Sequence, residues 1–220
     1  MDLGALDPIK PYLNFFHPIF MWALLASTRY IFRNDVPGDF VECGVWRGGS
    51  AMAMALTLLD EGDHDRSIWL YDTFEGMTAP TWADVDRSGK EASVTFDERK
   101  RGADQSAWCY SPLEEVQANM RRINFAEERV HFVKGDVSCT LRAQTPESIG
   151  LLRLDTDWYE STRDELKVLY PKLSPLGVCI VDDYGHWEGA RKAVDEYLDE
   201  IHPRPLLARL DYTGRMWVKA

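Results

Sequence analysis

Short apolar runs alternate along the chain with longer segments of helical periodicity. Apolar runs of strand length lie at residues 40–43, 68–71, 130–133, 149–154 and 178–181. Segments with a helical pattern separate several of these runs. Strands that alternate with helices predict an α/β fold, with a mostly parallel sheet and helices on both of its faces.

Residues that begin and end helices mark the boundaries of these segments. Gly48, Gly49 and Ser50 begin a helix that Gly62 ends. The tetrapeptide SPLE at 111–114 has the form of a capping box and predicts a helix to about residue 123. Further helices are expected at 161–170, before Pro171 and Pro175, and at 186–201. Residues 206–210 and 215–219 predict a terminal hairpin.

Two segments do not follow this alternation of strands and helices. Each is predicted to cover the site at which a substrate binds. Residues 1–38 are rich in aromatic and apolar side chains, and we expect a helical lid or dimerisation segment before a single domain at 39–220. Residues 73–110 are irregular and polar, as substrate-covering insertions often are. The apolar stretch at 19–26 is too short to span a membrane. A membrane-surface helix is the alternative, but its polar face carries few cations.

Composition excludes some classes of function. The 220 residues carry 25 Lys and Arg against 36 Asp and Glu, which gives a net charge of −11. Such an acidic chain lacks the basic stripe that nucleic-acid binding needs, and its field suits a bound cation. The four cysteines form no C-x-x-C pair, and no secretory signal is visible. We therefore expect a protein of a reducing compartment, the cytoplasm, with no nucleic acid or membrane as partner.

Carboxylates follow every predicted parallel strand. They are Glu42, Asp72, Asp136, the pair Asp155 and Asp157, and the pair Asp182 and Asp183. Because ligands bind at the carboxyl ends of parallel strands, this edge of the sheet is the expected site. Four aspartates on two neighbouring strands would repel one another unless a cation lay between them. Oxygen ligands of this kind suit Mg²⁺.

The first loop, ECGVWRGGS at 42–50, lacks both the P-loop lysine and the G-x-G-x-x-G pattern. Gly44 permits a tight turn or a close approach to a ligand, and Glu42 suits a cationic ligand group. Asp72 lies where nucleotide-binding folds place an acceptor for ribose hydroxyls. Asp136 is either an acceptor for an adenine amino group or a solvated turn residue.

His186 follows the last acidic pair closely, and is either a base, a substrate contact or an exposed residue at the start of a helix. Trp46, Trp82, Trp108 and Trp158 lie in segments near the expected site, where they form either walls for a substrate or ordinary core.

Five motifs together resemble the macrocin O-methyltransferase family, which methylates sugars of antibiotics. They are VECGVWRGG at 41–49, YDTFEG at 71–76, LEEV at 113–116, RLDTDWYEST at 153–162, and VDDYG at 181–185 followed by Gly189 and Ala190. The resemblance covers roughly residues 36–220. It implies a Rossmann-like class I methyltransferase fold, whose seven-stranded sheet is mostly parallel with an antiparallel last strand.

The resemblance also implies ligands and residue roles. S-adenosylmethionine would lie against Glu42, Gly44, Gly48, Ser50, Asp72, Thr73, Phe74, Asp136, Val137, Ser138 and Asp155. Mg²⁺ would be held by Asp155, Asp182 and Asp183. Asp157 would be the general base, with His186 as its rival. The acceptor would be a sugar hydroxyl of a small molecule, and the protein a homodimer or higher homo-oligomer.

Three alternatives to a sugar O-methyltransferase remain at this point. A catechol or another vicinal diol is an equally good acceptor for Mg²⁺-assisted methyl transfer. A binding module that has lost turnover would also keep the nucleotide site. An Mg²⁺-dependent phosphatase of the haloacid dehalogenase type shares the D-x-D strand, but the 27 positions from Asp155 to Asp182 leave too little room for its other motifs.

Overall fold

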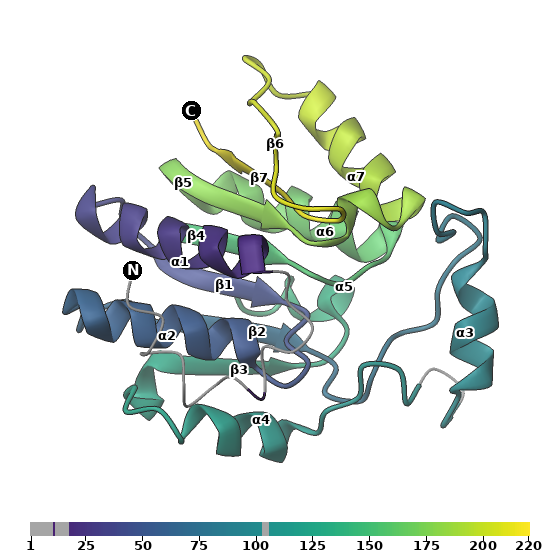
Figure 1. Ribbon diagram of the computed structural model, residues 1–220, viewed down its shortest axis with the longest axis horizontal. Coiled ribbons are helices and arrows are strands. Elements are labelled where there is room, and N and C mark those ends of the chain that lie inside the picture. Colours follow the sequence, from purple (N-terminus) through teal and green to yellow (C-terminus); the bar gives the residue numbers. More distant parts are fainter. Residues whose placement is uncertain (1–10, 12–17, 103–105) are drawn as a thin grey trace.

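The computed structural model describes residue 11, residues 18–102 and residues 106–220. A seven-stranded sheet in the order β3-β2-β1-β4-β5-β7-β6 forms its centre (Figure 1). Strands β1 to β5 pair in parallel, whereas β7 runs antiparallel to β5 and β6. The predicted mostly parallel sheet with an antiparallel end is therefore confirmed. The strands are β1 (Asp39–Cys43), β2 (Ile68–Asp72), β3 (Val130–Lys134), β4 (Ile149–Leu154), β5 (Leu173–Val181), β6 (Ala208–Arg209) and β7 (Arg215–Val218).

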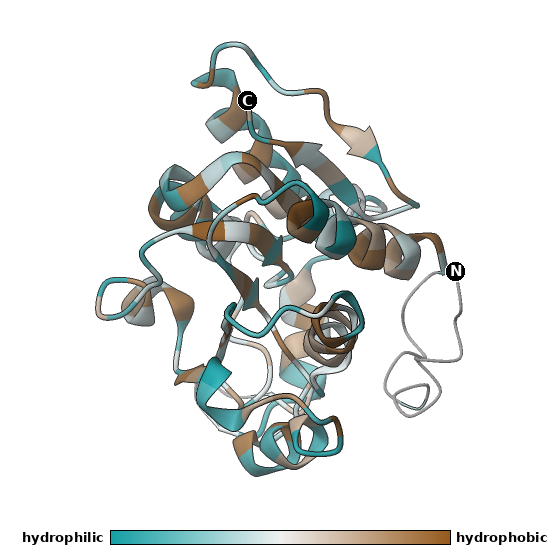
Figure 2. Cartoon of the chain, turned by 90° about the vertical axis from the view of Figure 1, so that its left-hand side faces the viewer, coloured by the Kyte–Doolittle hydropathy of each residue, from teal (hydrophilic) through white to brown (hydrophobic). Residues whose placement is uncertain are grey.

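Helices cover both faces of this sheet. On one face lie α1 (Pro18–Arg33), α2 (Gly49–Glu61) and α4 (Leu113–Met120), and on the other α5 (Val137–Thr140), α6 (Tyr159–Leu169) and α7 (Glu188–Asp199) (Figure 1). Alternate residues of a strand enter different cores: Phe40 packs under the first layer and its neighbour Val41 under the second. Figure 2 shows brown and teal residues side by side on the helices, as expected when one side of a helix is buried.

Several predicted boundaries need correction. Strand β5 begins five residues earlier than expected and includes Pro175, at a place where its pairing with β4 shifts register. Helix α4 ends at Met120, and its N-cap is Pro112, so the predicted capping box is wrong. The Ser111 hydroxyl instead donates to Glu115 at 3.2 Å, one turn further along the helix. The predicted hairpin strand at 206–210 is reduced to the two residues of β6.

The N-terminal segment and the insertion both contain helices. Helix α1 packs on α2, where Arg33 of α1 pairs with Glu61 at 2.7 Å. The expected N-terminal helix is thus present from Pro18 to Arg33, whereas the part of the predicted segment before it, apart from residue 11, lies outside the described residues. The insertion is not wholly irregular, because it forms α3 (Ala92–Glu98), which projects away from the sheet (Figure 1). None of the helices described here is long and apolar enough to cross a membrane.

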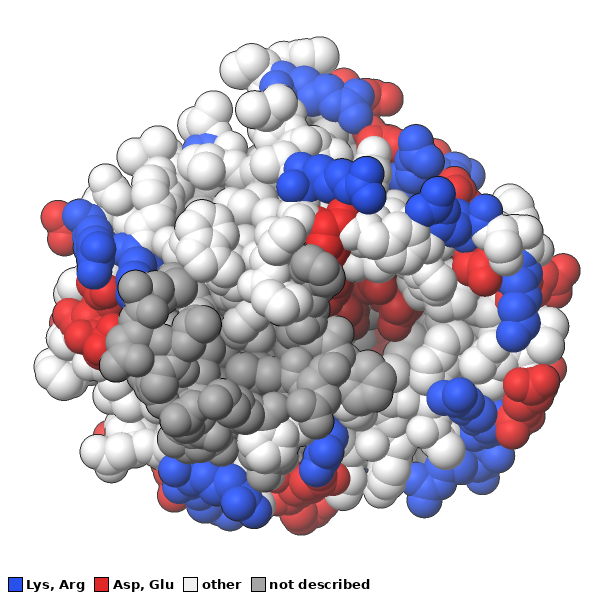
Figure 3. Space-filling model, viewed as in Figure 1, with Lys and Arg blue, Asp and Glu red and all other residues white. Residues whose placement is uncertain are grey.

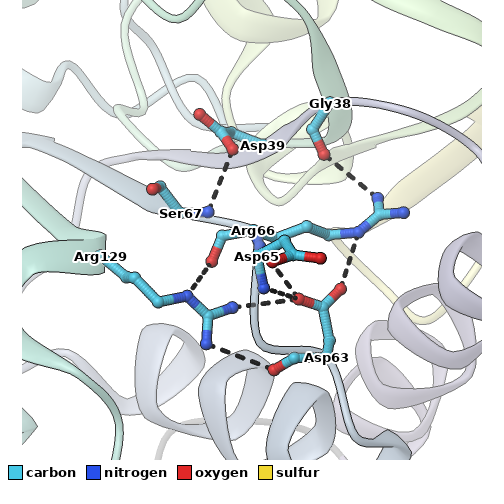
Figure 4. Close-up of polar contacts among 7 residues, drawn as sticks. All are labelled: Gly38, Asp39, Asp63, Asp65, Arg66, Ser67 and Arg129. Atoms are coloured by element: carbon cyan, nitrogen blue, oxygen red, sulfur yellow. Dashed lines mark hydrogen bonds and ion pairs between the residues drawn. The ribbon is translucent and has the colours of Figure 1, made fainter.

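A buried ion-pair network closes the end of the sheet opposite the predicted site (Figure 4). Asp63, which is 6% exposed, accepts from Arg66 Nε at 2.9 Å and from Arg129 Nη2 at 3.0 Å. Arg66 in turn donates to the backbone oxygen of Gly38, before β1, at 3.1 Å. The network joins the starts of β1, β2 and β3, so it holds the strands in register without entering the expected site.

Replacing Asp63 with alanine is expected to lower the free energy of unfolding by about 3 kcal/mol, because both arginines would lose their buried partner. Asp65→Ala is the matched control, since Asp65 is exposed and its removal should change stability by less than about 0.5 kcal/mol. Urea denaturation measures both. Equal stabilities of the two variants would show that the network contributes nothing to the fold.

Candidate active site

A cavity lies at the carboxyl ends of β1, β2, β3 and β4, where the sequence places the methyl donor. Six of the predicted cofactor residues line it: Gly44, Asp72, Thr73, Asp136, Val137 and Asp155. Tyr71, Gly76, Met77, Thr78, Gly135, Thr156 and Ser161 complete its wall. The predicted residues Glu42, Gly48, Ser50, Phe74 and Ser138 are not part of this wall.

The first loop owes its shape to Gly44 and Asp72. Gly44 has φ +81°, and a β-carbon on it would lie 1.9 Å from the backbone oxygen of Asp155, so only glycine fits between the two strand ends. Asp72 Oδ2 accepts from the backbone nitrogens of Val45 at 2.7 Å and Trp46 at 3.0 Å. Its Oδ1 accepts from the nitrogen of Phe74 at 2.7 Å. Asp72 therefore organises the loop as well as lining the cavity.

Other predicted cofactor residues support this wall from behind. Gly48, with φ +83°, is the N-cap of α2, and Ser50 is buried in its first turn. Phe74 is buried behind the loop at φ +53°. Asp136 accepts from the Ser138 nitrogen at 2.8 Å, which caps the short helix α5.

Glu42 has a different environment from the one the sequence suggested. Its side chain is 1% exposed, and its Oε1 accepts from Arg153 Nη1 at 2.7 Å. Burial raises the pKa of Glu42 to about 7, against the opposing effect of Arg153. The partner of this carboxylate is thus an arginine of β4, which the sequence analysis did not single out. A charged residue in the middle of an apolar strand is the pattern that points to it.

The second cavity is a wide cleft of about 1010 Å³ that adjoins the first. Figure 3 shows it as a hollow with acidic side chains at its floor. The four predicted aspartates, Asp155, Asp157, Asp182 and Asp183, all line it. The two strand ends therefore bring the carboxylates together, as the sequence predicts.

Arg153 partly neutralises this acidic floor. One of its nitrogens, Nη2, donates to Asp155 Oδ2 at 2.7 Å and to Asp182 Oδ2 at 2.6 Å. Burial lowers the pKa of Arg153, but Asp155, Glu42 and Asp182 together raise it above its usual range. The arginine therefore stays charged and ties the ends of β4 and β5 to Glu42 of β1.

The four carboxyl groups are protonated more readily than ordinary aspartates. Burial raises the pKa of Asp155 and of Asp183 well above the usual value, and it also raises that of Asp182. The pKa of Asp157 rises to about 7, first through burial and then through the charge of Asp155. A carboxylate with a pKa near neutrality is suited to accept a proton.

The donor set of the floor fits a divalent cation in its chemistry. All four side chains offer oxygens, and Asp183 Oδ2 is buried without a hydrogen-bond partner among the described residues. A buried oxygen without a partner destabilises the folded protein unless a cation or a hydrogen-bond donor lies against it. Arg153 engages two of the other oxygens, and no three His, Cys, Asp or Glu side chains in the described part of the chain are arranged to ligate a metal ion.

His186 and the tryptophans lie at different places relative to the cleft. His186 Nδ1 lies 3.2 Å from the hydroxyl of Tyr212, and the histidine is not part of the cleft wall. Trp46 and Trp108 do line the cleft, as the sequence suggested. Trp158 is buried beside Trp108, with ring centroids 5.7 Å apart, and Trp82 is 87% exposed. Trp187, which the sequence analysis did not single out, donates to Asp157 at 2.7 Å.

Both predicted coverings contribute residues to the wall of the cleft. From α1 comes Phe20, and from the insertion come Gly76, Met77, Arg99, Ala107, Trp108, Cys109 and Tyr110. The insertion is fixed to the domain by Asp84, which is fully buried. Asp84 accepts from the Tyr159 nitrogen at 2.8 Å and so caps α6, which has no capping side chain of its own.

Comparison with known proteins identifies relatives of the whole domain. The family model for macrocin O-methyltransferases matches residues 21–219. A tetracenomycin 4′-O-methyltransferase of Streptomyces olivaceus is 37% identical over 88% of this chain and 70% of its own length. The demethyldecarbamoylnovobiocin O-methyltransferase of Streptomyces niveus is also 37% identical, over 84% of this chain and 67% of its own.

Solved structures agree with this relationship. The O-methyltransferase NovP has a TM-score of 0.80 at 32% identity, and the match covers 92% of this chain and 80% of that one. The calicheamicin methyltransferase CalS11, at 21% identity and a TM-score of 0.66, shares the fold. Because the family model matches nearly the whole chain and relatives at 37% identity are aligned over most of it, the protein belongs to the macrocin O-methyltransferase family and is an enzyme of the methyltransferase class.

Proposed function

We propose that the protein transfers a methyl group from S-adenosylmethionine to a sugar hydroxyl of a glycosylated natural product. The observation that carries this proposal is the common wall of the two cavities. Gly44, Asp72, Gly76, Met77 and Asp155 line both of them. A donor in the first cavity would therefore lie next to an acceptor in the second, whose wall includes the four carboxylates.

The donor is expected to bind at the ends of β1, β2 and β3. Asp72 and Asp136 offer carboxylates to the ribose and adenine portions, and Gly44 lets the ligand approach the backbone closely. S-adenosylmethionine would supply an activated methyl group, with the bond from carbon to the acceptor oxygen forming as the carbon–sulfur bond breaks. The protein's task is to align the acceptor and to remove its proton.

We assign Asp157 as the base that removes the proton of the acceptor hydroxyl. It lines the acceptor cleft, and a pKa of about 7 lets it be deprotonated near neutral pH while remaining a useful base. His186 is a weaker candidate, because its ring packs beside Tyr212 outside the cleft wall.

The proposed reaction also uses Mg²⁺, which Asp155, Asp182 and Asp183 would hold. It would lower the pKa of a coordinated hydroxyl and fix its direction. The buried, unpartnered oxygen of Asp183 and the raised pKa values of the cluster support it, because a cation would relieve both.

The acceptor class rests on the relatives and on the size of the cleft. The matched enzymes are named for methylation of a rhamnosyl tetracenomycin, of demethyldecarbamoylnovobiocin and of mycinamicin III. A cleft of about 1010 Å³ with Trp46, Trp108 and Tyr212 in its wall has room for a sugar and part of the group it is attached to.

Removal of divalent metal tests the proposed site of Mg²⁺. Methyl transfer should disappear in EDTA and return with added Mg²⁺, whereas the calorimetric Kd for S-adenosylmethionine should change by less than about threefold, since the ion serves the acceptor. Asp183→Ala should reproduce the loss with the cofactor Kd likewise preserved. Full turnover in EDTA would refute Mg²⁺ at this cluster, and absence of S-adenosylmethionine binding would refute the methyl donor.

A further inference from the structure

Asp157 has a backbone conformation that its surroundings must maintain. Its φ of +66° lies in the left-handed region, which is unfavourable for a residue with a side chain. The adjoining Thr156 is fixed on both sides: its hydroxyl donates to Glu165 at 2.9 Å and its oxygen accepts from the Trp158 nitrogen at 2.7 Å. These contacts hold the backbone, and the direction of the Asp157 carboxylate depends on its own partners, the side chain of Asp183 and the indole of Trp187.

The indole of Trp187 supplies that direction. Its Nε1 donates to Asp157 Oδ1 at 2.7 Å, a short bond typical of a charged acceptor. Trp187 is 6% exposed, and its ring centroid lies 5.1 Å from that of Trp158 and 6.0 Å from that of Trp108. The ring of His186 also packs against that of Trp187, with centroids 4.7 Å apart. A ring enclosed in this way has no freedom to rotate, so its donor points at one place.

Backbone hydrogen bonds from the insertion fix the chain on both sides of Trp187. The nitrogen of Arg87 donates to the oxygen of His186 at 3.0 Å, and the nitrogen of Glu188 donates to the oxygen of Val85 at 3.0 Å. Trp108, which is itself in the insertion, lines the acceptor cleft while it contacts Trp187. The segment that covers the acceptor therefore also seats the residue that orients Asp157.

We propose that Trp187 is a positioning residue, whose indole N–H holds the carboxylate of Asp157 in the orientation that receives the acceptor's proton. The proposal deepens the function given above and rests on Asp157 as the base. One oxygen of the carboxylate is committed to Trp187, and the group as a whole remains at the cleft wall. Without the indole, the carboxylate could turn about its side-chain bonds and the base would be misplaced.

Trp187→Phe removes the N–H and keeps most of the ring. We expect kcat to fall about 10- to 100-fold, the scale of a hydrogen bond to a charged group, with the acceptor KM and the S-adenosylmethionine Kd within about threefold of wild type. Trp217→Phe is the matched control, because Trp217 is also a buried indole, donates to Tyr170 at 3.1 Å and lies in the core away from the cleft. The Trp217→Phe variant should be less stable than wild type but have the same kcat.

A second readout does not depend on turnover. In protein labelled with ¹⁵N at the indoles, the Trp187 N–H resonance, assigned by its absence in Trp187→Phe or Trp187→Tyr, should move upfield in Asp157→Asn, because the acceptor loses its charge. The Trp217 resonance should stay in place. An unmoved Trp187 resonance would overturn the proposal, and so would a Trp187→Phe enzyme with wild-type kcat. Full activity of Asp157→Asn together with a moved resonance would instead refute Asp157 as the base while leaving the contact intact.

Discussion

Asp157→Asn is expected to lower kcat by about 100-fold or more, with the affinity for S-adenosylmethionine little changed. Asparagine keeps the size of the side chain and its acceptor oxygen for Trp187, but it cannot take a proton at neutral pH. A sugar hydroxyl is a poor nucleophile, so loss of the base should appear in the chemical step. Steady-state kinetics with saturating donor, together with calorimetry of donor binding, separates the two effects.

His186→Ala is the companion variant for this test. His186 contacts Tyr212 and packs perpendicular to the ring of Trp187, and it is not part of the cleft wall, so its removal should cost less than Asp157→Asn. The reverse ranking, with Asp157→Asn active and His186→Ala inactive, would transfer the role of base to His186.

Arg153→Met is expected to lower the free energy of unfolding by about 4 kcal/mol, the scale of a broken buried ion pair. Arg153 and Glu42 are both 1% exposed, and the same guanidinium also holds Asp155 and Asp182. Methionine fills part of the space and leaves three carboxylates without their cation. Guanidinium chloride denaturation measures the loss.

Two controls separate the buried charge from a general effect of the substitution. Arg153→Met combined with Glu42→Gln should recover part of the stability, because the deepest carboxylate is then neutral. Arg121→Met removes the partner of Glu127 on the surface, where both side chains are more than half exposed, and should cost at most about 1 kcal/mol. An Arg153→Met protein as stable as Arg121→Met would contradict the structural role of the cluster.

The architecture of the sheet was predictable because local patterns determine it. Runs such as 149–154 are apolar at every position but one, as strands buried on both faces are, and the intervening helices require parallel pairing. Boundaries were less predictable, because tertiary contacts decide them. The start of β5 passes through Pro175, where the pairing changes register, and α6 begins where Asp84 of the insertion caps it.

The acidic floor was predictable for a related reason: parallel strands end at one edge, so carboxylates that follow them must meet. Their partners were not predictable by the same reasoning. Arg153 could have been found from its place inside an apolar strand, since a buried charge requires a counter-charge. Trp187 and Asp84 carry no such local mark, because their partners Asp157 and Tyr159 lie 30 and 75 positions away.

The proposed reaction is tested most directly by following the methyl group itself. The protein is incubated with S-adenosylmethionine labelled in its methyl group, Mg²⁺ and two panels of acceptors, one of glycosides and one of catechols, and the label is located by mass spectrometry. We expect a methyl ether on a sugar ring of a glycoside, formed with Mg²⁺ and absent with EDTA or in Asp157→Asn. Label found only on catechols would contradict the sugar as acceptor, and no transfer to any acceptor by protein that binds the donor would contradict the proposed reaction.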